Sequence, residues 1–362
     1  FTMKALLTAG GRATRLRPVT HTINKHLIPL ANKPMLFHAL EKIAETGITE
    51  VGININEDEK EIQRVLGDGA QWGLRITYIK QTGGALGLAH IIKNAKDVGF
   101  LDGPFLMYLG DNIILGSIRR FVERFQNEQL NCMLALSRVK DPERFGVPEM
   151  DVHGRIVRVV EKPLVPMSPF AITGIYLYDQ HALDAVDIIK PSARGEMEIT
   201  DVHQYYLDHG LNVGYEEISG WWKDTGKPED LLEGNLLILN DMPAAAFRIE
   251  TRVPETARLQ GKVAIGLGTR IEGNVLIRGP VVIGKNCHIS NAYIGPYTAI
   301  GDNAVVANTE IEHSIIFEGA SISCGTRVVD SIIGANAQLV PANQSLPVGH
   351  KMVIGDNTYL EM

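Results

Sequence analysis

Residues 10–34 read GGRATRLRPVTHTINKHLIPLANKP, and they follow a short apolar run, Ala5 to Ala9, that predicts a buried strand. The stretch is rich in Arg and Lys, and no Asp or Glu precedes Glu41, although the chain has a formal net charge of −7. A loop at a strand end offers free backbone N–H groups, and a rim of Arg and Lys adds positive charge. We therefore expect this segment to bind a polyphosphate, with a surface loop that is merely basic as the alternative.

Two common phosphate loops do not fit the stretch. The Walker A motif requires Gly before its Lys, whereas Lys25 follows Asn24. The dinucleotide fingerprint requires a third glycine and a helix that begins directly after the loop. Here Pro18 and Pro29 keep the segment irregular, and a helix is predicted only after Pro34. Long irregular segments in compact domains are usually functional.

The stretch resembles the signature of the sugar nucleotidyltransferases, G-G-x-G-T-R-L-x-P-x-T followed by K-x-L-x-P and K-P-M. The matching residues are Gly10, Gly11, Thr14, Arg15, Leu16, Pro18, Thr20, Lys25, Leu27, Pro29, Lys33, Pro34 and Met35. Within that family the chain is most similar to long-form glucose-1-phosphate thymidylyltransferases. Ala13 stands where the family usually has Gly. A left-handed Ala would cost about 1 kcal/mol, so we expect a negative φ at Ala13. A left-handed Ala13 would favour a non-catalytic regulatory subunit.

Length and composition predict two domains in a chain of 362 residues, with 45% hydrophobic residues and a mean hydropathy near zero. We place a catalytic domain at residues 1–242 and a second domain at 243–362. The acidic balance argues against a nucleic-acid partner, and the apolar runs are too short to span a membrane. Three cysteines without C-x-x-C spacing are typical of a reducing, cytoplasmic setting and argue against structural zinc.

In the first domain, apolar strands alternate with helical segments. The predicted strands are Val51–Ile55, Leu74–Ile79, Phe105–Leu109 and Met133–Leu136, and the predicted helices are Met35–Glu45, Glu57–Leu66, Leu88–Ala95 and Ile118–Phe125. The alternation predicts an α/β, Rossmann-like domain whose mixed sheet is mostly parallel and has helices on both faces. Ligands of such sheets bind beyond the carboxyl ends of strands, where Gly10–Gly11 and Gly110–Asp111 both lie.

After a short linker near Met242, aliphatic residues recur about every six positions. They are Ile265, Ile271, Ile277, Ile283, Ile289, Ile294, Ile300, Val306, Ile311, Ile316, Ile322, Val328, Ile333 and Leu339, with occasional one-residue slips. Such a hexapeptide repeat predicts a β-helix with inward-facing aliphatic residues. A β-sandwich is the alternative, but its strands recur at wider spacing. The pattern resembles the left-handed parallel β-helix found behind several nucleotidyltransferases.

Two aspartates are candidates for a metal site. Asp111 directly follows a buried strand, and Asp224 lies in GWWKDTGKPED. Each has a plain structural alternative as a turn residue, and Asp224 also lies near the start of a helix. The family places metal-binding carboxylates in both motifs. Two carboxylates together with phosphate oxygens suit Mg²⁺, which we expect as the cofactor.

The resemblance also implies further roles, residue by residue. Arg15 and Lys25 are implied to stabilise the transition state at the triphosphate. The implied nucleotide-binding residues are Gly10, Gly11, Ala13, Thr14, Arg15, Gln81 and Gly87. The implied sugar phosphate-binding residues are Gly146, Glu161, Lys162, Tyr176 and Arg194. In the family the residue matching Gln81 reads a pyrimidine. Here one residue is inserted after Gln81 and Ala85 replaces a proline, so we expect a looser loop that accepts both dTTP and UTP.

The sequence thus predicts a nucleotidyltransferase that forms an NDP-hexose, dTDP-glucose first, and pyrophosphate from a nucleoside triphosphate and a hexose 1-phosphate. The expected mechanism is direct Mg²⁺-assisted displacement, because no Ser, Cys or His is set beside a base. One alternative is an enzyme that uses UTP, or that also transfers acetyl groups, and that acts on glucose or N-acetylglucosamine 1-phosphate. The catalytic histidine of the acetyl transfer could be His288, His313 or His350. Another is the non-catalytic subunit. We expect little room for an acyl-CoA site before Met362, and a β-helix that serves homo-oligomer assembly.

Overall fold

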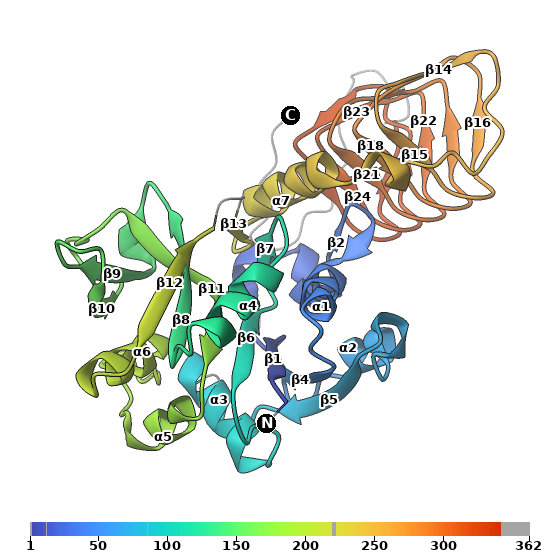
Figure 1. Ribbon diagram of the computed structural model, residues 1–362. Helices are drawn as coiled ribbons and strands as arrows, with labels where there is room; N and C mark the ends of the chain where they lie inside the picture. The colour runs from blue at the N-terminus through green and yellow to red at the C-terminus, as the bar shows by residue number, and fades with distance from the viewer. Residues whose placement is uncertain (1, 12, 85, 219–221, 342–362) are drawn as a thin grey trace. The chain divides into compact units, whose positions relative to one another are not determined.

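The computed structural model describes residues 2–11, 13–84, 86–218 and 222–341. It divides into two compact units. One unit comprises Phe1–Arg12 and Leu36–Asp224, and the other comprises Ala13–Met35 and Thr225–Met362. The first unit contains an α/β sheet and the second contains a β-helix (Figure 1). Among the described residues, no helix is long and apolar enough to cross a membrane.

A seven-stranded sheet forms the centre of the first unit, with strand order β12-β8-β11-β6-β1-β4-β5. The strands are β1 (Lys4–Thr8), β4 (Glu50–Ile55), β5 (Arg75–Lys80), β6 (Phe105–Leu109), β8 (Cys132–Arg138), β11 (Phe170–Tyr178) and β12 (Val213–Glu217). All neighbours are parallel except β11, which runs antiparallel to β6 and β8. The predicted mostly parallel mixed sheet is confirmed.

In the part of the chain that the structure describes, six α-helices of at least six residues surround this sheet. They are α1 (Met35–Glu45), α2 (Glu61–Leu66), α3 (Leu88–Asp97), α4 (Arg119–Asn127), α5 (His181–Ile188) and α6 (Ile199–Asp208). Helix α2 begins four residues later than the sequence predicts. The reason is local, because the Glu59 side chain accepts the backbone N–H groups of Glu61 and Ile62 at 2.8 and 3.0 Å and caps the helix there.

Helices cover both faces of the sheet. Leu134 of β8 and Tyr176 of β11 belong to the core cluster that includes α3, α5 and α6. Their neighbours Ala135 and Ile175 point the other way and line a cavity of about 150 Å³ with Phe121 of α4. Successive strand residues face opposite sides of a sheet, so this alternation places α4 across the sheet from the other three helices.

Two small ribbons carry side chains of interest. Strand β7 (Asn112–Ile114) pairs antiparallel with β13 (Trp222–Asp224), and β9 (Gly146–Met150) pairs antiparallel with β10 (Ile156–Glu161). Both ribbons therefore begin or end at residues that the sequence analysis assigned to a site.

The second unit begins with the signature segment. The prolines keep it irregular, as predicted, with 3₁₀ turns at Thr14–Leu16, Val19–His21 and Lys25–Leu27 and a hairpin of β2 (Pro29–Leu30) and β3 (Lys33–Pro34). Other 3₁₀ turns are Ala70–Trp72, Pro142–Arg144 and Ala244–Ala246. Helix α7 (Pro228–Asp241) starts on its proline and ends directly before Met242, near which the linker was expected.

Three parallel five-stranded sheets form the left-handed β-helix, and Figure 1 shows its stacked coils. One sheet contains β14 (Ala257–Gln260), β17 (Val275–Arg278), β20 (Tyr293–Ile294), β23 (Glu310–Glu312) and β26 (Arg327–Val329). The next contains β15 (Val263–Ile265), β18 (Val281–Ile283), β21 (Thr298–Ile300), β24 (Ile315–Ile316) and β27 (Ile332–Ile333). The third contains β16 (Arg270–Glu272), β19 (His288–Ser290), β22 (Val305–Ala307), β25 (Ser321–Ile322) and β28 (Gln338–Leu339).

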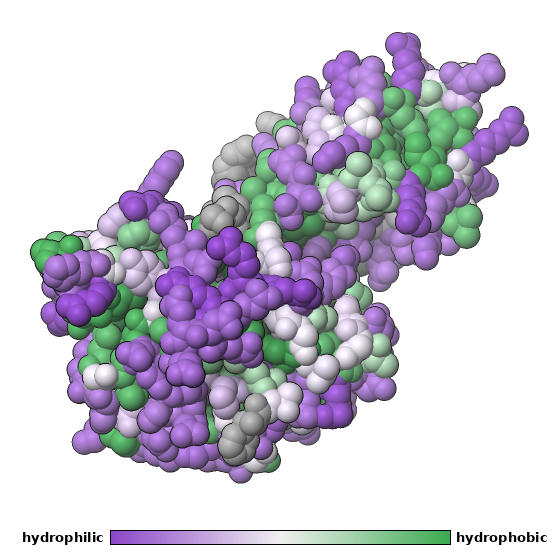
Figure 2. Space-filling model, in the orientation of Figure 1, coloured by the Kyte–Doolittle hydropathy of each residue, from purple (hydrophilic) through white to green (hydrophobic). Residues whose placement is uncertain are grey.

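The aliphatic repeat forms the β-helix core, as the six-residue spacing predicts. Of the repeat positions, all but Val328 and Leu339 belong to the buried cluster, and those two pack against it. Val263 pairs with Val281 and Val281 with Thr298, so one coil takes 18 residues and the next 17. The one-residue slip in the sequence is therefore a shortened coil. In Figure 2 hydrophilic side chains cover most of the visible surface, and hydrophobic ones show through on the β-helix.

Candidate active site

Two glycines follow β1 and leave room for polar side chains from the next strands. A Cβ atom on Gly10 would lie 2.9 Å from Gln81 Oε1 and 3.1 Å from Asn54 Nδ2, so the position tolerates no side chain. Gly11 has a φ of 106°, a conformation that favours glycine, and its N–H donates to Asn56 Oδ1 at 3.2 Å. The side chains of Asn54 and Asn56 thus lie directly against the backbone of the two glycines.

Gln81 follows β5 and is buried with its amide oriented. Its Oε1 accepts a hydrogen bond from Asn54 Nδ2 at 3.1 Å, and its Nε2 donates to the Gly84 carbonyl at 2.7 Å. One donor hydrogen of Nε2 remains for a ligand. The sequence pattern pointed to Gln81 but not to Asn54 and Asn56. Both lie at the carboxyl end of β4, and polar residues at the end of an apolar strand were the available signal.

Gly87 connects the Gln81 loop to the segment that carries Arg194. A Cβ on Gly87 would lie 2.4 Å from the Met197 carbonyl oxygen, and the φ of Gly87 is 100°. Met197 N–H donates to the Leu86 carbonyl at 2.7 Å, and Ala89 N–H donates to the Met197 carbonyl at 3.1 Å. Gly87, which the resemblance assigns to the nucleotide, therefore lets the backbones of two loops pack closely against each other.

Ala13 departs from its predicted conformation. Its φ is 43° and its ψ is 42°, which is left-handed, so the expected negative φ was wrong. The surrounding bonds fix this conformation, because the Ala13 carbonyl accepts from Thr20 Oγ1 at 2.9 Å and from Leu16 N–H at 3.1 Å. Those two bonds hold the strained backbone that the family's usual glycine would adopt at no steric cost.

Arg15 and Lys25 lie on two of the 3₁₀ turns of the signature segment. Arg15 is exposed, and Thr14 beside it begins the first turn. Lys25 is half-buried, and its carbonyl accepts the Ile28 N–H at 3.1 Å. Asn24 caps this turn by accepting the His26 N–H at 2.9 Å. The Asn24 cap and this backbone hydrogen bond therefore fix the turn that carries Lys25.

The two candidate metal ligands come from adjacent strands. Asp111 follows β6 and its Oδ1 accepts from Asn112 Nδ2 at 2.8 Å. Asn112 pairs across the β7–β13 ribbon with Asp224, which brings the two aspartate backbones close together. The Asp224 side chain lies outside the described part of the structure. Asn112 is itself buried and its Oδ1 accepts from Trp222 Nε1.

The implied sugar site gathers around the β9–β10 ribbon. Gly146 pairs with Glu161, and a Cβ on Gly146 would lie 2.8 Å from Thr200 Cγ2 and 3.5 Å from Glu161 Oε2. Lys162 has a φ of 44°, and its Nζ lies 3.5 Å from Glu161 Oε1. Burial raises the pKa of Glu161 and Glu198 adds to the rise, whereas Lys162 and Arg194 oppose it.

Arg194 joins the same group of charges. It forms a bidentate pair with Glu198 at 2.8 and 2.9 Å and lies 3.6 Å from Glu161 Oε1. Its side chain is still 43% exposed, so it can reach an anion. Tyr176 lies deeper, in the core beside His203, where burial raises the pKa of its hydroxyl and the charges of Glu161 and Asp111 add to the rise. Lys162 and Arg194 thus lie close to the largely buried carboxylate of Glu161, beside Gly146.

Residues 4–241 match the family model described as nucleotidyl transferase. The chain belongs to the nucleotidyl transferase family. It is 43% identical over 361 residues, 99% of both chains, to a glucose-1-phosphate thymidylyltransferase of Streptomyces antibioticus. It is 41% identical to the low-salt glycan biosynthesis nucleotidyltransferase Agl11 of Haloferax volcanii, over 99% of this chain and 100% of that one.

A crystal structure with sucrose, assigned as a glucose-1-phosphate thymidylyltransferase of Bacillus anthracis, is similar to this nucleotidyl transferase. The TM-score is 0.61 and the identity is 39%, over 67% of this chain and 96% of that chain. Nucleotidyl transferases of this family generally use a divalent metal ion. Within the described residues, no three His, Cys, Asp or Glu side chains gather to hold one. The candidate donor set is therefore the aspartate pair, completed by substrate oxygens.

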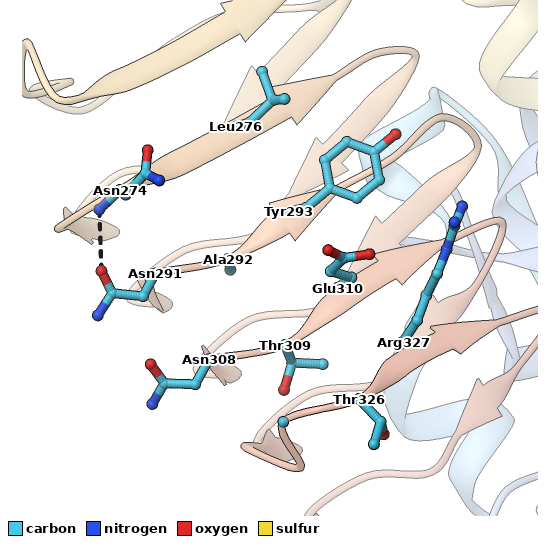
Figure 3. Close-up of a pocket in the computed structure, with 11 residues that line it drawn as sticks. Asn274, Leu276, Asn291, Ala292, Tyr293, Asn308, Thr309, Glu310, Thr326 and Arg327 are labelled. Carbon is cyan, nitrogen blue, oxygen red and sulfur yellow. Dashed lines mark hydrogen bonds between the residues drawn. The ribbon is translucent and has the colours of Figure 1, made fainter.

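The nucleotidyl transferase also carries an open groove of about 750 Å³ on its β-helix (Figure 3). Leu276, Tyr293, Glu310 and Arg327 stand in register along one side, and Asn274 N–H donates to Asn291 Oδ1 at 3.1 Å on the other. The histidines named for acetyl transfer lie elsewhere. His288 Nε2 lies 3.0 Å from Glu272 and His313 Nδ1 bonds Asp330, while His350 lies outside the described residues.

Proposed function

We propose that this nucleotidyl transferase forms dTDP-glucose and pyrophosphate from dTTP and glucose 1-phosphate. The observation that carries the proposal is the match, across 99% of both chains, to the Streptomyces antibioticus thymidylyltransferase. The left-handed Ala13 by itself favours the non-catalytic alternative, but this full-length similarity to a named enzyme outweighs one backbone angle. The Bacillus anthracis structure supports the same assignment for the first two thirds of the chain. We further propose that residues 1–242 form the catalytic domain, that residues 243–362 form the β-helix domain, and that the protein is a homo-oligomer.

The reaction joins two polyanions, so charge neutralisation and alignment carry most of the catalysis. We assign Arg15 and Lys25 to the triphosphate, and Lys162 and Arg194 to the phosphate of the sugar. An oxygen of the sugar phosphate attacks the α-phosphorus in line, and pyrophosphate leaves. Lys162 and Arg194 lie 3.5 and 3.6 Å from Glu161 Oε1. We propose that each side chain turns from its carboxylate partner to the incoming phosphate, which requires only a local movement.

Mg²⁺ fits the residues present. Asp111 is oriented by the Asn112 amide and lies next to the backbone of Asp224, and one or two carboxylates plus phosphate oxygens are the ligands Mg²⁺ prefers. When bound, the ion would neutralise charge that develops on the phosphate oxygens. Asp111 and Asp224 are the residues that would hold it.

We assign Gly10, Gly11, Ala13 and Thr14 to the phosphates and Gln81 and Gly87 to the base. Asn54 donates to Gln81 Oε1 and Gly84 accepts one Nε2 hydrogen, so the group that Gln81 would offer a base is the second Nε2 hydrogen, a donor. A donor suits a base carbonyl, which thymine and uracil both present, and a single methyl group allows discrimination of only about 10–200-fold. We therefore propose that UTP is a slower second substrate.

The test is steady-state kinetics with dTTP, UTP, ATP and GTP, each against glucose 1-phosphate and N-acetylglucosamine 1-phosphate, with pyrophosphate release as readout. We expect dTTP with glucose 1-phosphate to give the highest kcat/KM, and UTP to lie within about 200-fold of it. A preference for a purine triphosphate would contradict the base assignment. Consumption of acetyl-CoA would instead support the bifunctional alternative.

A further inference from the structure

The β2–β3 hairpin that follows Lys25 has a strained two-residue turn. Leu30 pairs with Lys33, and the turn residues Ala31 and Asn32 have φ values of 49° and 62°. Such turns usually carry Asn or Gly, which tolerate the left-handed region, whereas alanine does not. A strained conformation persists only where surrounding contacts determine it. The hairpin tip must therefore be held from outside.

Three hydrogen bonds hold the tip to α7 and to the β-helix. The Ala31 N–H donates to Asn235 Oδ1 at 2.8 Å, and Asn235 Nδ2 donates to the Tyr297 carbonyl at 3.0 Å. Asn32 Nδ2 donates to the Ile300 carbonyl at 2.6 Å. Tyr297 is also left-handed, with a φ of 63°. The Asn235 amide thus joins the backbones of two strained residues that are 266 positions apart in the sequence (297 minus 31).

Asn235 has no accessible surface, and it lies inside helix α7. Asparagine favours neither burial nor a helix interior, and an unpaired buried amide is costly. Its place is explained by its two partners. Ala31 also packs against an apolar cluster that the buried Leu239, Val282 and Ala299 form. Hydrogen bonds and apolar packing therefore both hold the hairpin tip at Ala31 and Asn32.

Backbone hydrogen bonds and buried side chains connect the hairpin tip back to Lys25. The Met35 N–H donates to the Ile28 carbonyl at 3.1 Å and closes the base of the hairpin, and the Ile28 N–H donates to the Lys25 carbonyl at 3.1 Å. Leu27, Ile28 and Leu30 are all buried. A displacement of the hairpin would therefore move the backbone of Lys25.

We infer that Asn235 and Asn32 are positioning residues that fasten the Lys25 loop to the β-helix and so hold Lys25 in place for nucleotidyl transfer. The inference rests on the proposed function, because that function assigns Lys25 to the triphosphate. It gives the β-helix a catalytic role in addition to assembly. A misplacement of about 1 Å can cost about 100-fold in rate, so a few hydrogen bonds far from the reacting atoms have a measurable effect.

The test compares Asn235→Ala and Asn32→Gly in the full chain. Asn32→Gly tolerates the left-handed backbone and removes the whole side chain, with its hydrogen bond to the Ile300 carbonyl. Asn235→Ala leaves the hairpin sequence unchanged, so an effect common to both variants comes from the lost hydrogen bonds and not from added backbone freedom. Asn240→Ala is the matched control, since Asn240 is exposed on the same helix. The readouts are amide hydrogen exchange over residues 25–35 without substrate, the melting temperature, and kcat with KM for each substrate, measured well below the melting temperature.

In both variants we expect exchange at the hairpin to accelerate by about 10-fold or more and kcat to fall by roughly 10- to 100-fold. The KM for the sugar phosphate should stay within about twofold, because Lys25 is not assigned to that substrate. The control should match the wild-type protein in every readout. Faster exchange with unchanged kcat would overturn the positioning role, as would unchanged exchange or an equal rate loss in Asn240→Ala. A wild-type protein that releases no pyrophosphate from any pair of substrates would overturn the proposed function, while the exchange data would still test the fastening.

Discussion

Asp111 lies at the end of β6, where the Asn112 amide orients its carboxylate. We predict that Asp111→Asn lowers kcat by roughly 100-fold or more, since it removes a charge that holds the metal, and that Asp224→Asn does the same. The fold should survive, because Asn has the size of Asp and at position 111 keeps an oxygen that can accept from the Asn112 amide. Turnover and a thermal melt of each variant would check this, with exposed Asp97→Asn as control. Near-normal turnover at saturating Mg²⁺ would rule out the assignment.

Ala13 is strained in its left-handed conformation. We predict that Ala13→Gly raises the free energy of unfolding by about 0.5–1 kcal/mol, since relief of the strain exceeds the extra entropy of a glycine in the unfolded chain. Activity should be retained, because the family motif has glycine there. The comparison is Ala5→Gly in β1, which has no left-handed strain to relieve and should lose stability in the same urea titration. A stability loss at Ala13 would show that its methyl group is required.

Glu161 provides a pH-dependent readout at the same scale. Burial raises the pKa of Glu161 in the folded state. At a pH between its unfolded-state and folded-state pKa values, the folded protein therefore binds more protons than the unfolded protein. The free energy of unfolding falls as the pH rises through that interval. We predict that Glu161→Gln is more stable than the wild-type protein at neutral pH and that this advantage disappears below the unfolded pKa. Urea melts from pH 3.5 to 7 would measure the difference. The variant should also show a higher KM for the sugar phosphate.

At the scale of elements, Gly87 joins the end of the Gln81 loop to the segment before α6. We predict that Gly87→Ala breaks the Leu86–Met197 pairing, because the new Cβ would lie 2.4 Å from a carbonyl oxygen. Gly99→Ala is a matched control: it also has a positive φ, of 75°, but has open space around it. Kinetics should show a raised KM for both substrates in Gly87→Ala alone. Equal effects in the two variants would mean that backbone strain, and not the close contact, is responsible.

At the scale of the whole molecule, the β-helix has two expected roles, assembly and support of the Lys25 loop. We predict that truncation after Asp241 lowers the oligomeric state and leaves transfer measurable but slower. Light scattering and pyrophosphate release would test both parts. An unchanged oligomeric state would contradict assembly through the β-helix.

Local patterns predicted much of this fold. Helix α1 and strand β6 have the predicted bounds, because apolar periodicity and a proline or glycine at the ends specify them locally. The six-residue repeat predicted the β-helix core for the same reason, since each coil repeats one local solution. The candidate residues of the site could be proposed from the sequence because their spacing along the chain is itself the pattern, and their roles stay predictions.

The sequence by itself determined the two architectures and the family, because both depend on periods and motifs that are read along the chain. Only the tertiary structure decided what surrounds those motifs. The left-handed Ala13, the Asn54 that orients Gln81, and the Asn235 that joins Ala31 to Tyr297 depend on residues that are distant in sequence. Hydrogen bonds across such separations leave no periodic trace, and a local conformational preference yields when several of them outweigh its cost.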